Sequence, residues 1–172
     1  MKPINNFETL ETPSEFKRLV PGGYVCRITK VEDVANKEYL RMEYDIAEGD
    51  LKGYWDENDE RYGWRDSFIR SYKDKAQAFF KQFIQTVEAS NNGFVWKWDE
   101  QSLKGKMLGI ILGEEEYEKR DGSVGTRLRV SKVMSIDRIR NGNYIVPSKK
   151  TIPVNERASA PAVTDDDLPF DF

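Results

Sequence analysis

The sequence of 172 residues contains no histidine and only one cysteine, Cys26. Without histidine, catalytic schemes that use imidazole as an acid or base are excluded, as are imidazole-ligated metal sites. One cysteine cannot form an internal disulfide or a cysteine-based zinc cage. Cys26 lies in an apolar-patterned stretch from Tyr24 to Ile28, so we expect a small core residue rather than a nucleophile.

Long apolar runs are also missing. No stretch approaches the roughly 20 apolar residues of a membrane span, and the first ten residues lack the apolar core of a signal peptide. There is no phosphate-binding Gly-x-x-x-x-Gly-Lys-[Ser/Thr] loop and no glycine-rich dinucleotide fingerprint. Charged residues make up 33% of the chain and apolar residues 38%. We therefore expect a soluble cytoplasmic protein that needs no cofactor.

Charge is unevenly distributed along the chain. The formal net charge is −3, which argues weakly against a nucleic-acid partner. Residues 151–172 carry one basic and five acidic side chains, a net charge of −4, whereas the other 150 residues carry 26 basic and 25 acidic ones, a net charge of +1. Because the body is nearly neutral, local patches decide what it binds.

Hydrophobic periodicity predicts a mainly β domain with one helix. Alternation of apolar and polar residues predicts five strands, over residues 24–31, 38–46, 64–70, 106–117 and 127–134. A long polar loop is expected over 47–63, and 94–98 reads as short and extended. A stripe of apolar residues at three- to four-residue spacing predicts a core-packing helix over 72–90.

The order strand, strand, strand, helix, strand, strand is that of the OB-fold, a five-stranded Greek-key barrel. Small mixed α+β domains can share this order. We expect an N-terminal arm over 1–20, an OB-fold-like domain over 21–144 and a tail over 145–172. Four of the seven prolines lie in that tail. Residues 151–172 are expected to be disordered, because they cannot bury enough apolar surface to offset their ordering entropy.

An OB-fold places oligonucleotides across its second and third strands, between the loops that join strands 1–2 and 4–5. Single-strand binding needs cations for the phosphates and aromatic rings for the bases. Four rings cluster in or beside a polar loop, where burying them is awkward, although the loop is also acidic and Trp64 or Phe68 could simply belong to the core. The candidate nucleic-acid-binding residues are Arg27, Lys37, Tyr39, Arg41, Tyr54, Trp55, Tyr62, Trp64, Arg65, Arg70, Lys119, Arg120, Arg127 and Arg129.

The last residues of the sequence read Asp-Asp-Asp-Leu-Pro-Phe-Asp-Phe. This segment resembles the acidic tip of bacterial single-stranded DNA-binding proteins, which ends in Asp-Asp-Asp-Ile-Pro-Phe. The resemblance implies that the tip recruits replication and recombination proteins. A phenylalanine can fill an apolar pocket while the aspartates steer the tip to a basic rim. Either of two phenylalanines could be the anchor, and the implied partner-binding residues are Asp165, Asp166, Asp167, Leu168, Pro169, Phe170 and Phe172.

The body resembles single-stranded DNA-binding and replication-accessory proteins encoded by phages and prophages of Gram-positive bacteria. The matching stretches are residues 21–31, 67–73 and 103–116. The resemblance implies a role in viral DNA replication or recombination inside a bacterial host cell. It assigns no functional residue in the body.

Two alternatives to this reading stay open. A nuclease would hold Mg²⁺ with spaced carboxylates, for which the candidates are Asp56, Asp59, Glu60 and Glu114–Glu116. A protein–protein adaptor would display the tail and bind no nucleic acid. We expect a non-enzymatic single-stranded DNA-binding protein, and the sequence does not separate DNA from RNA or one oligomeric state from another.

Overall fold

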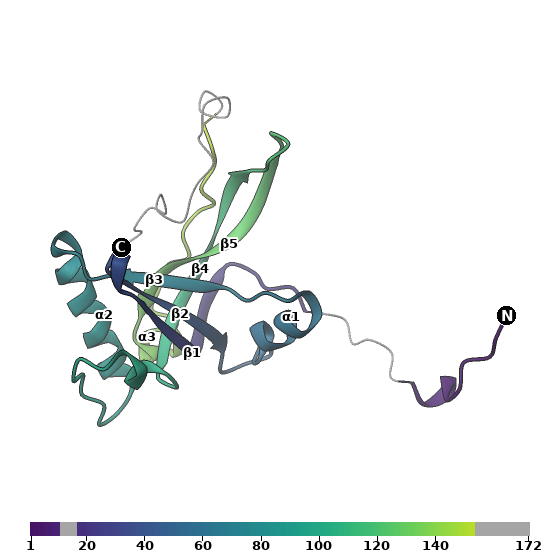
Figure 1. Cartoon of the computed structure of the whole chain (residues 1–172), viewed down its shortest axis with the longest axis horizontal. Coiled ribbons are helices and arrows are strands. Elements are labelled where there is room, and N and C mark those ends of the chain that lie inside the picture. The colour runs from purple at the N-terminus through teal and green to yellow at the C-terminus, as the bar shows by residue number, and fades with distance from the viewer. Residues whose placement is uncertain (11–16, 154–172) are drawn as a thin grey trace.

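The structure, a computed structural model, describes residues 1–10 and 17–153. Its strands and α-helices are, in chain order, β1 (Gly22–Val34), β2 (Tyr39–Ile46), α1 (Tyr54–Tyr62), β3 (Ser67–Ser71), α2 (Gln77–Ser90), β4 (Met107–Glu118), β5 (Val124–Met134) and α3 (Ile136–Arg140) (Figure 1). Short 3₁₀ helices lie at Phe7–Thr9, Ala35–Lys37, Asp74–Ala76 and Glu100–Leu103. No helix in the part described is long and apolar enough to cross a membrane.

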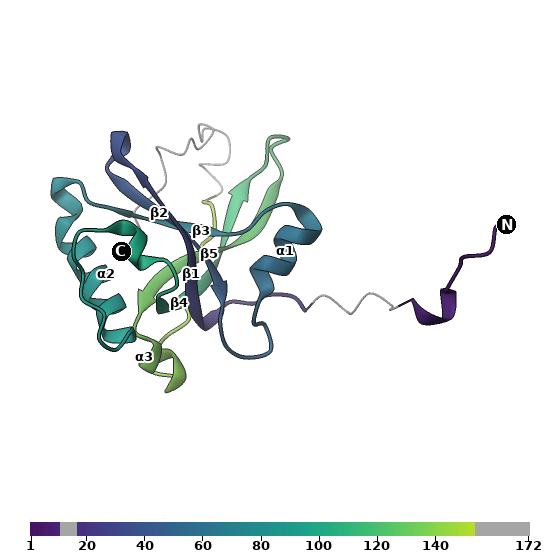
Figure 2. The ribbon, with the colours of Figure 1, turned by 60° about the horizontal axis from the view of Figure 1, so that its bottom comes forward.

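All five strands form one antiparallel sheet in the order β3-β2-β1-β4-β5. The long strand β1 is central, because its first half pairs with β4 and its second half with β2. The helices α1 and α2 lie at opposite ends of this sheet (Figures 1 and 2). The prediction of a mainly β domain is confirmed. The edge strands β3 and β5 are not paired with each other, so the sheet is not closed.

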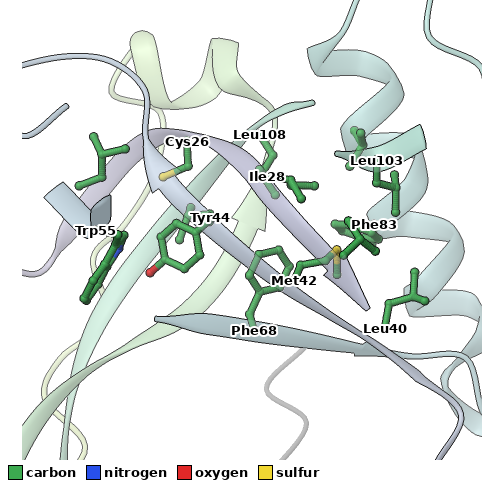
Figure 3. Packing of buried hydrophobic residues seen from close by; sticks show 14 of the residues in the cluster. Cys26, Ile28, Leu40, Met42, Tyr44, Trp55, Phe68, Phe83, Leu103 and Leu108 are labelled. Atoms are coloured by element: carbon green, nitrogen blue, oxygen red, sulfur yellow. The ribbon is translucent and has the colours of Figure 1, made fainter. Parts of the chain in front are cut away.

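The main core lies between the inner face of the sheet and α2. The strands contribute Cys26, Ile28, Met42 and Tyr44, all fully buried (Figure 3). The predicted stripe of α2 packs against them through its buried phenylalanines and aliphatic residues. Burial raises the pKa of the Cys26 thiol well above its usual value, so the thiol stays protonated. The expectation that Cys26 is a core residue is confirmed.

A smaller apolar cluster covers the outer face of β1 and β4. Met134 and Ile139 pack there on Val25 and Ile111. A Cβ atom added at Gly109 would lie 2.5 Å from Cγ1 of Ile139, so only glycine allows this close approach. The helix α3 and its neighbours therefore cover this part of the outer face.

The body is longer at both ends than the predicted 21–144. Leu19 is buried in the main core, although it belongs to the predicted arm. Lys150 bridges to Glu115, its N–H donates to the carbonyl of Glu114, and the N–H of Ile152 donates to the Glu116 side chain. β1 begins opposite Leu112, so this segment lies along a part of β4 that β1 does not reach.

The prediction of a polar loop over 47–63 is wrong for the second half of that range, which forms α1. The helix has few buried residues, and its first turn is capped by a side chain of the preceding strand, β2. The side chain of Asp45, at the end of β2, accepts hydrogen bonds from the N–H groups of Ile46 (2.7 Å), Trp55 (2.8 Å) and Asp56 (3.0 Å). Such a cap satisfies the orphan donors of a helix start, but it leaves no local signature in the sequence.

Other boundaries differ by a few residues. β3 begins at Ser67 rather than Trp64, and β5 begins at Val124 rather than Arg127. The helix expected from 72 begins at Gln77, after a 3₁₀ turn that starts at Asp74. The segment 94–98 forms no strand pairing.

Replacing Asp45 by alanine tests the remote cap. Asp45→Ala is expected to lower the free energy of unfolding by about 1–3 kcal/mol, because buried N–H donors lose their acceptor. Burial raises the pKa of the Asp45 carboxyl, while the N–H groups that donate to it lower the pKa. Asp45→Asn keeps one acceptor oxygen, so it should lower the free energy of unfolding by less than Asp45→Ala does. Urea denaturation measures the difference, with exposed Asp50→Ala as control. Equal losses for Asp45→Ala and Asp50→Ala would contradict the cap.

Candidate nucleic-acid interface

The outer face of β2 and β3, where the sequence analysis places the site, offers less than expected. Tyr39 is only 6% exposed, because it sits between its cross-strand neighbours Val34 and Ser71. The expectation of an exposed ring at Tyr39 is therefore wrong. Arg41 is partly buried between Glu32 and Ile69 in the register.

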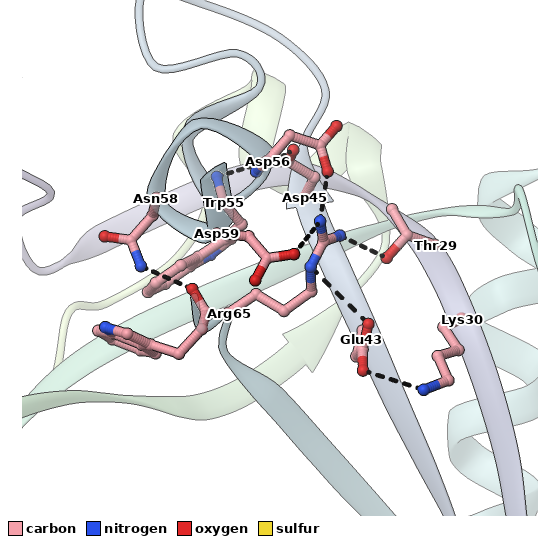
Figure 4. Close-up of polar contacts among 10 residues, drawn as sticks. Thr29, Lys30, Glu43, Asp45, Trp55, Asp56, Asn58, Asp59 and Arg65 are labelled. Atoms are coloured by element: carbon pink, nitrogen blue, oxygen red, sulfur yellow. Dashed lines mark hydrogen bonds and ion pairs between the residues drawn. The ribbon is translucent and has the colours of Figure 1, made fainter. Parts of the chain in front are cut away.

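Arg65 lies beside this face, and carboxylates surround its guanidinium (Figure 4). Nη2 is 2.7 Å from Asp56 and 3.2 Å from Asp59, and Nε is 3.8 Å from Glu43. Burial opposes the charged form of Arg65, but the hydrogen bonds to Asp56 and Asp59 raise its pKa overall. Lys30 adds a second cation, 3.5 Å from Glu43. Through these contacts Arg65 ties α1 to β2. Because acidic groups outnumber basic ones here, the patch does not favour phosphate.

Of the four clustered rings, one is buried, one is partly buried and two are exposed. Trp55 is only 4% exposed and Tyr54 packs against the core, so the expectation that Trp55 is available for stacking is wrong. The physical reason is α1, which turns Trp55 toward the sheet. Tyr62 is 62% exposed and Trp64 is 54% exposed.

Trp64 is exposed but held in place. Its ring centroid lies 5.3 Å from that of Trp55, and its carbonyl accepts a 2.7 Å hydrogen bond from the buried side chain of Asn58. Trp55 in turn packs edge-on against Tyr44, with the centroids 6.1 Å apart. The indole of Trp64 is thus a fixed platform with much of its surface in solvent.

The next residues lead from this platform toward β5. The buried Tyr44 hydroxyl donates a 2.6 Å hydrogen bond to Asp66. Burial raises the pKa of Asp66, while the Tyr44 hydrogen bond and the positive charges of Arg129 and Arg127 lower it. The start of β3 is therefore close enough to β5 to feel those charges.

Further along, Arg70 of β3 and Lys132 of β5 line the same small cavity. β3 and β5 thus approach each other at this cavity without strand pairing. We call this boundary the β3–β5 seam and define it by six residues: Trp64, Asp66 and Arg70 on the β3 side, and Arg127, Arg129 and Lys132 on the β5 side.

The seam carries an excess of positive charge. Arg127 and Arg129 share the carboxylate of Glu115, at 2.6 and 3.7 Å, and Asp66 is engaged by Tyr44. Burial alone lowers the pKa of Arg70 to about 10. Four cations therefore face two carboxylates along the seam, the opposite balance to the Arg65 patch.

The candidate Arg70 lies on the inner face of the sheet and not on the outer face of β2 and β3. It pairs with Leu40 in the register and shares the inner face of β3 with Phe68. Its guanidinium carbon lies 5.2 Å from the ring centroid of Phe68 and 5.7 Å from that of Phe83. Arg70 therefore belongs to the seam and not to the outer face of β2 and β3.

The remaining candidates lie elsewhere. Arg27 is exposed on β1, and Lys37 belongs to the turn between β1 and β2. Lys119 and Arg120 are exposed at the tip of the β4–β5 hairpin, which projects from the body in Figure 1. The structure thus brings four of the predicted residues together along the seam: Trp64, Arg70, Arg127 and Arg129. The tip residues 165–172 lie outside the described residues.

Sequence reasoning missed Lys132 and a second aromatic surface. A hollow of about 730 Å³ is lined by Trp96, Trp98, Tyr72 and Phe80. Trp98 is 84% exposed and has a φ of 60°, a backbone region that bulky residues rarely adopt. The alternation Phe-Val-Trp-Lys-Trp over 94–98 is the signal that could have found it. Asp33, Glu100 and Lys81 also line the hollow, so it has no excess of positive charge.

Within residues 1–10 and 17–153, no group of three or more histidine, cysteine or acidic side chains could hold a metal ion. Among the nuclease candidates, Asp56 and Asp59 both pair with Arg65. No protein-family model matches this chain, and no curated protein is significantly similar to it.

Proposed function

We propose that this chain binds single-stranded DNA along the β3–β5 seam and catalyses no reaction. The observation that carries the proposal is the excess of basic side chains at the seam beside the fixed, exposed ring of Trp64. The sequence resemblance supports a role in phage DNA replication or recombination in the cytoplasm of a bacterial host.

The chemistry of the seam suits an unpaired strand. A base whose face is exposed can stack on the indole of Trp64, which is worth about 1–3 kcal/mol. In a duplex both base faces are covered, so the ring gains nothing. The pair between Arg127 and Glu115 is partly exposed, and such pairs contribute only about 0–1 kcal/mol. A phosphate can therefore replace the carboxylate at small cost.

We also infer that the sheet is an OB-fold-like barrel opened at the seam. The order β3-β2-β1-β4-β5 becomes a closed ring once β3 and β5 pair. The helix α2 follows β3, precedes β4 and contacts β3, β4 and β5, as expected of a helix that covers one barrel end. The proposed strand path then follows the outer edge of β3 rather than the β2–β3 face usual for OB-folds.

Titration with oligo-dT, detected by tryptophan fluorescence, tests the proposal. The wild-type protein should prefer oligo-dT to duplex DNA of the same length and bind more weakly as salt rises. Trp64→Ala should lower the affinity about 5- to 100-fold, and Trp64→Phe should keep most of it. Trp98→Ala is the matched control, because it removes a more exposed indole away from the seam. Labelled single-stranded RNA as a second ligand separates the two nucleic acids.

Salt dependence locates the phosphates. Arg127→Ala with Arg129→Ala should flatten the plot of log affinity against log salt by about 0.7 per lost contact. Binding unaffected by Trp64→Ala and by the two arginine changes would remove the seam as the interface. No oligo-dT binding by the wild type would leave the adaptor alternative, and DNA degradation only with Mg²⁺ would favour a nuclease.

We further propose that residues 165–172 recruit replication or recombination proteins. The segment combines aspartates, which repel DNA and attract a basic surface, with two phenylalanines suited to an apolar pocket. Since the rest of the chain is nearly neutral, this acidic segment dominates the net charge.

Deleting Asp165–Phe172 should abolish recovery of such partners from a Gram-positive cell extract. Affinity for oligo-dT should stay equal or rise, because four negative charges are removed. Phe170→Ala and Phe172→Ala, made separately, identify the anchor by loss of recovery. Clearly weaker DNA binding after the deletion would contradict a tail that serves partners alone.

A further inference from the structure

A small cavity lies at the end of the seam nearest α2. Its volume is about 50 Å³, and Arg70, Lys132, Gln82, Phe79 and Phe83 line it. The two cations come from the two edge strands, and the other three residues come from α2. It therefore places two cations beside polar and apolar side chains, at the place where the sheet does not close.

Arg70 is the unusual member of this group. It sits on the core face of β3 against the rings of Phe68 and Phe83. One of its N–H groups donates to the carbonyl of Ile69 at 2.8 Å. Burial lowers its pKa, and no acidic group offsets that effect. Within the described residues, neither Arg70 nor Lys132 has a carboxylate within ion-pair distance.

A partly buried cation without a countercharge is costly, and a bound anion removes that cost. The cavity of about 50 Å³ exceeds the ~10–15 Å³ that a single water needs, so a small group of a few atoms fits in it. The planar guanidinium of arginine matches phosphate geometry through paired N–H donors. The cavity thus combines the charge and donors that a phosphate group needs.

We propose that Arg70 and Lys132 bind one phosphate group in this cavity, with the side-chain amide of Gln82 as a further donor. Where that phosphate belongs to a DNA strand, the inference rests on the proposed function and places one nucleotide at the α2 end of the seam. Phe79 is 41% exposed and lines the same cavity, so an aromatic side chain lies beside the proposed phosphate site.

Thermal unfolding with millimolar inorganic phosphate, against chloride at equal ionic strength, tests the phosphate chemistry alone. Phosphate near ten times its Kd should raise the wild-type Tm by about 2 °C or more. Arg70→Met keeps the bulk and removes the charge, and Lys132→Gln removes the exposed charge; both should abolish the rise. Lys81→Gln, on α2 but at the other hollow, is the matched control. If Arg70→Met does not fold, Lys132→Gln decides the question.

Oligo-dT and an abasic strand of the same length extend the test from inorganic phosphate to backbone phosphates, and the abasic strand removes any contribution of the bases. Both variants should bind either strand about 10-fold more weakly, while Lys81→Gln should not. Unchanged oligo affinity and an unchanged phosphate response in both variants would overturn the inference but leave the proposed function standing. A phosphate response that needs Arg70 and Lys132, in a protein that binds no oligonucleotide, would support the pocket and refute the proposed function.

Discussion

The structure depends on one constraint, which is that the sheet ends in two edge strands, β3 and β5, that do not pair with each other. Unpaired edges expose backbone N–H and C=O groups, and proteins cover or charge them to prevent association. Here α2 contacts both edges, and arginine and lysine side chains occupy the boundary. The basic side chains that protect the two edges also give the β3–β5 seam its positive charge.

Contacts with the buried core fix the indole of Trp64, at the other end of the seam. Tyr44 supports Trp55, Trp55 supports Trp64, and the Tyr44 hydroxyl holds Asp66 two residues beyond. A side chain that is already immobilised loses little conformational entropy on contact with a ligand. The remote cap from Asp45 positions α1, and with it Trp55, so the exposed ring depends on hydrogen bonds that are themselves buried.

Strict alternation predicted the strands, and the apolar stripe predicted α2, because both patterns report burial directly. The helix α1 escaped prediction since its cap comes from Asp45, ten residues before Trp55. The inward position of Arg70 follows from its pairing with Leu40. The sequence of one strand does not reveal which residue of the neighbouring strand it pairs with, so this position could not be predicted. Lys132 was missed because β4 and β5 change register between Ile111 and Leu112, so a strict alternation does not place it.

Arg65 and Arg70 show why counting cations cannot locate a binding site. They stand five residues apart, yet three carboxylates surround Arg65, two of which (Asp56 and Asp59) raise its pKa. Burial alone acts on Arg70, and it lowers the pKa of that residue. An anion that approaches Arg65 must displace existing partners in a patch of net negative charge. An anion that approaches Arg70 relieves an uncompensated charge. In a chain whose body is nearly neutral, this difference in local compensation favours Arg70 over Arg65 as a site for an anion.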